Sequence, residues 1–260
     1  MRFHINPERE LHKRDPMLYG HFLEHFQRQI YGGVYDPTSP FADEDGFRTD
    51  VLEALKRIKP PIIRWPGGCY VSAYDWHLGV GKERIPNFDK AWRVEESNEF
   101  GTDEFIKFCR KLGCEPYICT NAGTGTPEDM SNWVEYCNLK KMGRFAKERI
   151  ANGYEEPHAV KFWSIGNENY GHWEIGAKTV EEWGVLVREA AKMLRHVDPT
   201  AQLTAAAHAH GRILFRRGPG TAGERHQHRL YVNCHIRYSL LRVTDHYIIQ
   251  FPLAQSSLLA

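Results

Sequence analysis

Short apolar runs with the character of buried β-strands alternate with helix-forming stretches along most of the chain. The strand-like runs are "MLYGHFLEHF", "PIIRWPGG", "EPYICTNAG", "AVKFWSIGNE" and "AQLTAAA", and the helical stretches cover residues 50–58, 102–113, 126–137 and 179–197. Strands that alternate with helices in this way form βαβ units around a parallel sheet. We therefore predict an α/β fold: a partial (β/α)8 TIM barrel of about the first four to five βα units, with an irregular C-terminal tail.

Two of the predicted helices carry local start signals. Thr126 precedes Pro127, as expected for an N-cap followed by the first helical residue. Thr179 and Glu182 have the spacing of a capping box, and Pro199 marks the end of the same helix.

Polar side chains stand where the apolar runs end: Glu24, Arg64, Asn121, Asn167 and Glu168. In a (β/α)8 barrel the carboxyl ends of the strands form the catalytic face. A doubly wound open sheet is the alternative, but it normally carries a G-x-G-x-x-G phosphate turn after a strand. No stretch of this chain has that spacing.

The composition is that of an ordinary globular protein, with 42% hydrophobic and 26% charged residues. A formal net charge of +1 gives no argument for nucleic acid or a membrane surface as a partner. No apolar run approaches the roughly 18 residues of a membrane span, and the first residues lack the apolar segment of a signal peptide. We therefore expect a cytoplasmic location.

Six cysteines occur without any C-x-x-C pair. This spacing argues against a zinc ribbon and against a disulfide framework, and it favours reduced, mostly buried thiols.

The character of the chain changes after Ala207. Residues 208–260 hold seven arginines, no lysine and only two acidic residues, and the helical periodicity disappears. The stretch "RRGPGTAGERHQHR" is typical of a loop or of disorder.

Glu168 ends an apolar run, follows Asn167, and precedes Tyr170, His172 and Trp173. A carboxyl group at the mouth of an apolar sheet loses hydration, which suits it to general acid catalysis. The neighbouring amide can bind a substrate hydroxyl, and the aromatic rings offer flat surfaces suited to a sugar. A structural alternative, in which the Asn-Glu pair caps the next helix, explains the spacing equally well.

The segment "WSIGNENYGHWEIG" is similar to the one that carries the acid/base glutamate in α-L-arabinofuranosidases of glycoside hydrolase family fifty-one. Four further stretches resemble that family in the same order: "GHFLEHFQRQIYGGVYDP", "PPIIRWPGGCYVSAYDWHLGVG", "AWRVEESNEFGTDEFIKFCRKLG" and "NAGTGTPEDMSNWVEYCN". The resemblance covers about Leu18 to Ala207, about 190 of the 260 residues. Five ordered blocks are far more specific than one Asn-Glu pair.

The resemblance implies a retaining glycosidase that releases terminal α-L-arabinofuranosyl residues from arabinan or arabinoxylan oligosaccharides. On that reading Glu168 is the catalytic acid/base, Asn167 holds the 2-hydroxyl of the bound sugar, and Glu24 contacts sugar hydroxyls. Cys69 stands at a substrate-binding position where family members carry Asn or Cys. Trp92 is either a wall for the leaving-group sugar or a packed loop aromatic.

No cofactor and no metal ligand are implied, and the expected partner is an arabinose-containing oligosaccharide rather than nucleic acid or a membrane. A full-length member of the family is a candidate homo-oligomer. Arg64 either positions carboxylates in the site or forms a buried structural ion pair, and we favour the ion pair.

A retaining mechanism needs a second carboxylate about 5–5.5 Å from the first, acting as the nucleophile. The resemblance implies that it lies on the seventh barrel strand, yet only 92 residues follow Glu168. Glu224 and Asp245 are poor candidates because their surroundings do not read as a strand end. We therefore predict an incomplete (β/α)8 glycosidase catalytic domain in residues 1–207 and a non-homologous, disordered or frameshifted tail in residues 208–260.

Such a fragment exposes sheet edges, so we expect it to be unstable alone, prone to associate and nearly inactive. Two alternative functions stay open. One is another retaining barrel glycosidase, of the β-xylosidase or galactanase type. The other is a non-catalytic fragment whose tail binds metal through His208 and His210 or through His226 and His228.

Overall fold

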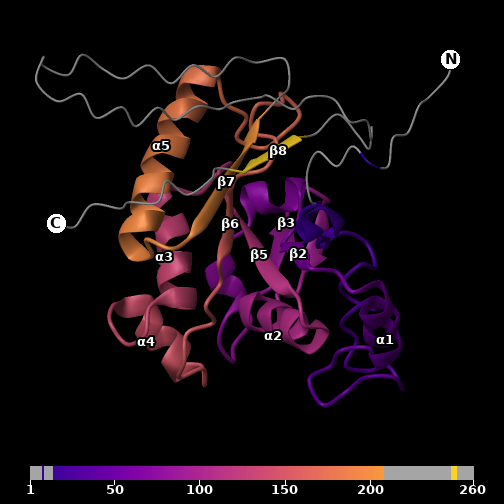
Figure 1. The fold of residues 1–260 in the computed structure, drawn as a ribbon. Helices are drawn as coiled ribbons and strands as arrows, with labels where there is room; N and C mark the ends of the chain where they lie inside the picture. The colour runs from indigo at the N-terminus through magenta and orange to yellow at the C-terminus, as the bar shows by residue number, and fades with distance from the viewer. Residues whose placement is uncertain (1–7, 9–13, 208–246, 251–260) are drawn as a thin grey trace, which may run out of the picture.

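The structure, a computed structural model, describes residue 8, residues 14–207 and residues 247–250. A six-stranded sheet, ordered β1-β2-β5-β6-β7-β8, forms its centre (Figure 1). The strands are β1 (His21–Phe22), β2 (Ile62–Trp65), β5 (Glu115–Thr120), β6 (Phe162–Ile165), β7 (Gln202–Ala207) and β8 (Tyr247–Gln250). The first five pair in parallel and in chain order. This order confirms the predicted partial barrel, because a doubly wound sheet reverses direction partway along.

Five α-helices connect or flank these strands: α1 (Thr49–Ile58), α2 (Thr102–Leu112), α3 (Pro127–Asn138), α4 (Arg144–Ala151) and α5 (Val180–Val197). Figure 1 shows α3, α4 and α5 on one side of the strands and α1 on the other. The side chains of Thr126 and Thr179 accept hydrogen bonds from the backbone N–H groups of Asp129 and Glu182, which confirms both predicted N-caps. No helix among the described residues has the length and apolar character needed to cross a membrane.

Several elements differ from the sequence-based expectation. Helix α4 was not predicted, and the long loop after β2 contains two 3₁₀ helices, η2 (Cys69–Ala73) and η3 (Trp76–Gly79), and a hairpin of β3 (Asn87–Asp89) and β4 (Val94–Glu96). Strand β1 is only two residues long. Strand β8 falls within the predicted tail and pairs antiparallel with β7, so it does not continue the parallel order of a barrel. The remainder of that tail lies outside the described residues.

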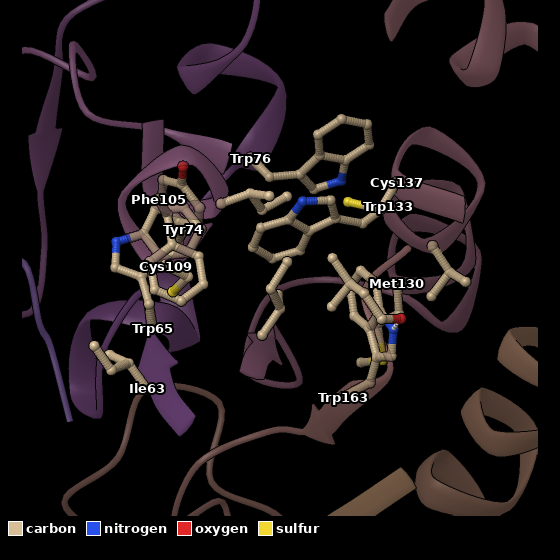
Figure 2. Packing of buried hydrophobic residues seen from close by; sticks show 14 of the residues in the cluster. Ile63, Trp65, Tyr74, Trp76, Phe105, Cys109, Met130, Trp133, Cys137 and Trp163 are labelled. Carbon is tan, nitrogen blue, oxygen red and sulfur yellow. Dashed lines mark hydrogen bonds between the residues drawn. The ribbon is translucent and has the colours of Figure 1, made fainter. Parts of the chain in front are cut away.

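Aromatic side chains dominate the core between the sheet and its helices. Trp65, Trp133 and Trp163 are fully buried and lie in one cluster (Figure 2). The Trp65 ring stacks on Phe105 at 4.9 Å between centroids, and Trp76 stacks on Trp133 at 5.8 Å. Truncating one such ring to alanine typically costs about 3–5 kcal/mol. The cluster therefore gives the ends of β2 and β6 a rigid base.

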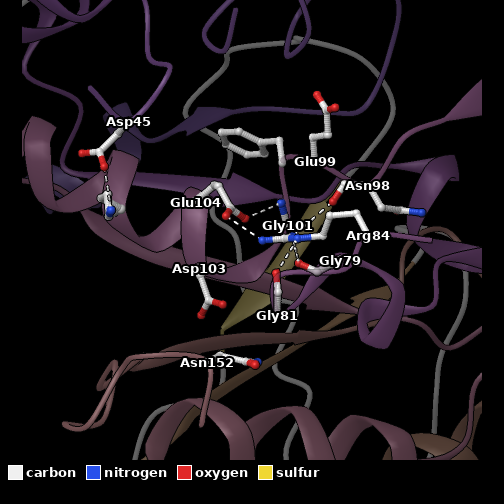
Figure 3. Close-up of polar contacts among 12 residues, drawn as sticks. Asp45, Gly79, Gly81, Arg84, Asn98, Glu99, Gly101, Asp103, Glu104 and Asn152 are labelled. Atoms are coloured by element: carbon white, nitrogen blue, oxygen red, sulfur yellow. Dashed lines mark hydrogen bonds and ion pairs between the residues drawn. The ribbon is translucent and has the colours of Figure 1, made fainter. Parts of the chain in front are cut away.

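One arginine ties the loop between β2 and α2 to the body of the protein (Figure 3). The Arg84 guanidinium donates to the Glu104 carboxylate at 2.7 Å and to the backbone carbonyls of Gly81 and Asn98. Glu104 in turn accepts a hydrogen bond from the Gly101 N–H at the start of α2. Because this loop includes the β3–β4 hairpin, the network fixes where the hairpin stands beside the strand ends.

Candidate active site

The chain turns sharply where β6 ends. Gly166 has φ of 70° and Glu168 has φ of 49°, both in the left-handed region. A Cβ at Gly166 would lie 2.3 Å from Asn169 Oδ1 and 2.6 Å from the Ala122 Cβ, so only glycine fits there. The Asn169 side chain also accepts the Asn167 N–H at 3.1 Å and holds the turn closed. The turn thus presents Asn167 and Glu168 together at the carboxyl end of the strand.

Glu168 is partly exposed at this turn. Its Oε2 accepts a hydrogen bond of 2.9 Å from the indole N–H of Trp173. A residue with a side chain rarely adopts a positive φ, and such strain is concentrated at functional sites. The strained turn supports the functional reading of the Asn-Glu pair over the alternative of a simple helix cap.

The amide of Asn167 has a fixed orientation. Arg64 Nη2 donates to its Oδ1 at 3.0 Å, while the buried Nδ2 has no hydrogen-bond partner among the described residues. The same guanidinium nitrogen lies 3.1 Å from the Cys119 Sγ, and the described residues contain no ion pair between Arg64 and a carboxylate. The favoured ion pair does not form within contact distance among the described residues, although the charge of Arg64 acts on the Glu24 carboxylate. The guanidinium orients the Asn167 amide, which leaves an N–H donor for a ligand.

Glu24 follows β1 and is buried. Its Oε1 accepts hydrogen bonds from the backbone N–H of Gly68 at 2.7 Å and of Tyr70 at 3.4 Å. Burial raises the pKa of this carboxyl, and the two N–H donors and the charge of Arg64 offset part of that rise. Gly67 allows the close approach, since a Cβ there would lie 2.5 Å from Glu24 Cγ.

Cys69 opens the 3₁₀ helix η2 (Cys69–Ala73) and is partly buried. Its Sγ and carboxylate oxygens of Glu168 and Glu174 all lie within 4.8 Å of one another. Burial raises the pKa of the Cys69 thiol to about 12, and the nearby carboxylates add to the rise. Glu174 was missed by sequence reasoning. Its only signal was proximity to Glu168 in the chain, and a six-residue spacing in a loop does not indicate that two side chains meet.

Trp92 lies in the turn of the β3–β4 hairpin and is partly buried. Its ring packs against Phe26 at 4.4 Å between centroids. The indole N–H lies close enough to Glu24 to favour the charged carboxylate, although it does not meet hydrogen-bond geometry with any described residue. The packed-aromatic interpretation is thus supported, and the role of Trp92 as a wall for a sugar stays a prediction.

Asn121 does not join this group of residues. Its amide donates to the Tyr74 carbonyl and to Thr124 Oγ1, each at 3.0 Å. It lines a separate cavity of about 380 Å³ between η2 and the start of α3. Asn121 therefore shapes the loop after β5 rather than the site around Glu168.

Residues 54–246 match the alpha-L-arabinofuranosidase 1 domain. The chain belongs to this family. The finding confirms the resemblance drawn from the five sequence blocks. The match extends beyond residue 207, and the predicted boundary between residues 207 and 208 stays a prediction.

Named relatives of this arabinofuranosidase family agree. Alpha-L-arabinofuranosidase C of Emericella nidulans is 47% identical over 201 residues, which are 76% of this chain and 40% of that protein. An intracellular exo-alpha-(1->5)-L-arabinofuranosidase of Halalkalibacterium halodurans is 41% identical over the same shares. The crystal structure of the Thermotoga maritima alpha-L-arabinofuranosidase in complex with arabinose has a TM-score of 0.71 and 52% identity, covering 72% of this chain and 39% of that one. The chain thus spans about 40% of the length of the curated relatives that it matches.

Proposed function

We propose that the chain carries the proton donor of a retaining glycosidase that releases terminal α-L-arabinofuranosyl residues from arabinan and arabinoxylan oligosaccharides. The observation that carries this proposal is the turn after β6, which presents the Glu168 carboxylate beside the unpartnered amide nitrogen of Asn167. The names of the relatives support arabinofuranosides over β-xylosides and galactans as substrates.

In the proposed reaction, Glu168 first protonates the oxygen of the leaving group and later, as a base, activates water. Asn167 Nδ2 donates to the 2-hydroxyl of the sugar, an interaction that strengthens as the oxocarbenium-like transition state forms. The buried Glu24 contacts further hydroxyls, and Cys69 borders the same space. We propose that the reaction takes place in the cytoplasm and that the protein binds arabinose-containing oligosaccharides.

A carboxylate oxygen of Glu174 lies within 4.8 Å of one of Glu168, close to the separation that a retaining pair needs. However, Glu174 is buried, and its Oε1 accepts a hydrogen bond from Ser72. It also belongs to the same loop as Glu168, whereas the two carboxyl groups of a retaining enzyme flank the scissile bond. We therefore do not assign the nucleophile to Glu174. Because we assign that role to no other described residue, we expect the purified chain to show little or no turnover.

Ligand binding tests the proposed function directly. We expect methyl α-L-arabinofuranoside, but not methyl β-D-xylopyranoside, to show saturation-transfer NMR signals with the purified chain. Asn167→Ala removes the amide donor and should abolish these signals, while the matched change Asn132→Ala on helix α3 should leave them intact. Equal binding of both glycosides, or binding unaffected by Asn167→Ala, would contradict the proposal.

Turnover tests the expected lack of a nucleophile. The purified chain is incubated with an aryl α-L-arabinofuranoside, beside Glu168→Gln and Glu174→Gln. We expect no release of the aryl group above the level of the two variants. Turnover that both substitutions abolish would instead identify Glu174 as the second carboxylate.

A further inference from the structure

Three potential metal ligands converge beside the proposed acid/base. Cys69 comes from the loop after β2, and Glu168 and Glu174 come from the loop after β6. One ligand atom of each, the thiol sulfur or a carboxylate oxygen, lies within 4.8 Å of the other two. Thiolate and carboxylate are both ligands that Zn²⁺ accepts, usually in tetrahedral sites at about 2.0–2.3 Å.

The orientation of Glu174 gives a second, independent indication of a ligand. Only 4% of this residue is exposed. Its Oε1 accepts a hydrogen bond from the Ser72 hydroxyl, while its buried Oε2 has no hydrogen-bond partner among the described residues. A buried carboxylate oxygen without a partner is costly, and a bound cation satisfies it. Ser72 then acts as the outer group that orients a metal ligand.

The local charge also favours a cation. After burial, the nearby Glu174 carboxylate disfavours the Cys69 thiolate most, and the negative charges of Glu168 and Glu24 add to this effect. A divalent cation compensates these negative charges and stabilises the thiolate, because metal binding displaces the thiol proton. Cys69 and Glu168 are only partly buried. A water would supply the fourth ligand of a tetrahedral site.

We propose that Cys69, Glu168 and Glu174 form a binding site for a thiophilic divalent cation such as Zn²⁺. Tetrahedral ligands at these bond lengths lie about 3.5 Å apart, so the side chains close by about 1 Å on binding. The cation occupies the carboxylate that the proposed function uses as proton donor, so the site acts as an inhibitory one. This last consequence rests on the proposed function, whereas metal binding itself does not.

Cobalt serves as a spectroscopic probe for the site. The full 260-residue chain, reduced and stripped of metal, is titrated with Co²⁺ and then with Zn²⁺. We expect about one equivalent of Co²⁺ with a thiolate-to-metal absorption band in the near ultraviolet, which Zn²⁺ then displaces. The experiment measures metal binding and not turnover. Its result therefore tests the metal site even if the proposed glycosidase function is wrong.

Substitutions assign the site to its residues. Cys69→Ser should abolish the thiolate band, and Glu174→Gln should weaken Co²⁺ binding at least tenfold while keeping an acceptor for Ser72. Cys114→Ser, which removes a buried thiol elsewhere, should change neither. Far-ultraviolet circular dichroism verifies that each variant is folded. If Glu174→Gln does not fold, the result for Cys69→Ser tests the proposal by itself.

The histidines of the C-terminal segment provide the competing explanation. A variant with His208, His210, His226 and His228 changed to alanine should retain the Co²⁺ band and its stoichiometry. Binding that disappears in this variant but survives Cys69→Ser overturns the proposal, as does a wild-type chain that binds neither metal.

Discussion

Cys69 illustrates how the surroundings of a residue set its chemistry. Burial and the carboxylates of Glu174 and Glu168 disfavour the thiolate, so the pKa of the thiol rises to about 12. Only the thiolate reacts with alkylating agents. The thiol therefore stays protonated and unreactive through neutral pH, although it is partly exposed.

We predict that iodoacetamide modifies Cys69 about a thousandfold more slowly at pH 8 than an ordinary thiol, with the rate still rising toward pH 12. Glu174→Gln removes a negative charge, lowers the pKa of Cys69 and accelerates the reaction. Peptide mass spectrometry measures the modification, and Glu95→Gln on the exposed face of β4 is the matched control. Modification of wild-type Cys69 at the rate of glutathione would show that the carboxylates do not govern its ionisation.

Gly67 is needed because the Glu24 side chain packs directly against it. A methyl group there would lie 2.5 Å from Glu24 Cγ and 2.8 Å from its Oε1. We predict that Gly67→Ala displaces the Glu24 side chain and lowers the free energy of unfolding by about 1–3 kcal/mol. Urea denaturation measures the loss. The same change at Gly153, where an added Cβ meets nothing within 4 Å, tests backbone strain alone because its φ is 101°.

At the scale of elements, helix α4 depends on one buried side chain. Arg149 is fully buried, and its guanidinium donates to five backbone carbonyls, those of Tyr136, Leu139, Lys140, Tyr154 and Glu155. These carbonyls belong to the end of α3 and to the segments on either side of α4. The arginine thus joins the end of α3 to the two loops that flank α4.

We predict that Arg149→Lys lowers the free energy of unfolding by about 2–4 kcal/mol, because an ammonium group cannot reach five carbonyls in a planar fork. Arg144→Lys, at the exposed start of the same helix, should change it by less than about 0.5 kcal/mol. Chemical denaturation of both variants measures the difference. Equal stability of the two variants would mean that water replaces the guanidinium without cost.

The elements also show where local signals suffice. Helices α3 and α5 begin at their predicted caps because Thr126 and Thr179 bond to backbone within three residues. Helix α4 begins after Gly143 without a side-chain cap, and it is stabilised by Arg149 contacts on other segments. The β3–β4 hairpin likewise depends on distant partners, since Glu96 accepts hydrogen bonds from Tyr31 and His25. Short-range patterns therefore predicted α3 and α5, but they did not predict α4 or the β3–β4 hairpin.

At the scale of the whole molecule, the β1 edge of the sheet is the feature that we expect to promote association between chains. Among the strands that the structure describes, β1 pairs only with β2, and Phe22 on it is 46% exposed. Unpaired strand edges and exposed apolar side chains promote association between chains.

We predict that the purified chain self-associates in a concentration-dependent manner in analytical ultracentrifugation. Phe22→Ser should weaken this association about tenfold, the equivalent of about 1.4 kcal/mol. Phe41→Ser changes an exposed ring in the turn region before α1, outside the strands of the sheet, and should have little effect. A single monomeric species for the wild-type chain up to high concentration would contradict the prediction.

The sequence by itself determined the alternation of the five parallel strands with helices α1, α2, α3 and α5, the order of those strands, and the polar residues at their carboxyl ends. It also determined the family, because five ordered blocks resemble it. These features are encoded by residues close together in the chain. Only the tertiary structure decided that Arg64 orients Asn167, and that Glu174 meets Cys69 and Glu168. Those contacts join β2 and the loop after it to the loop after β6, and they form because parallel strand ends meet at one edge of the sheet.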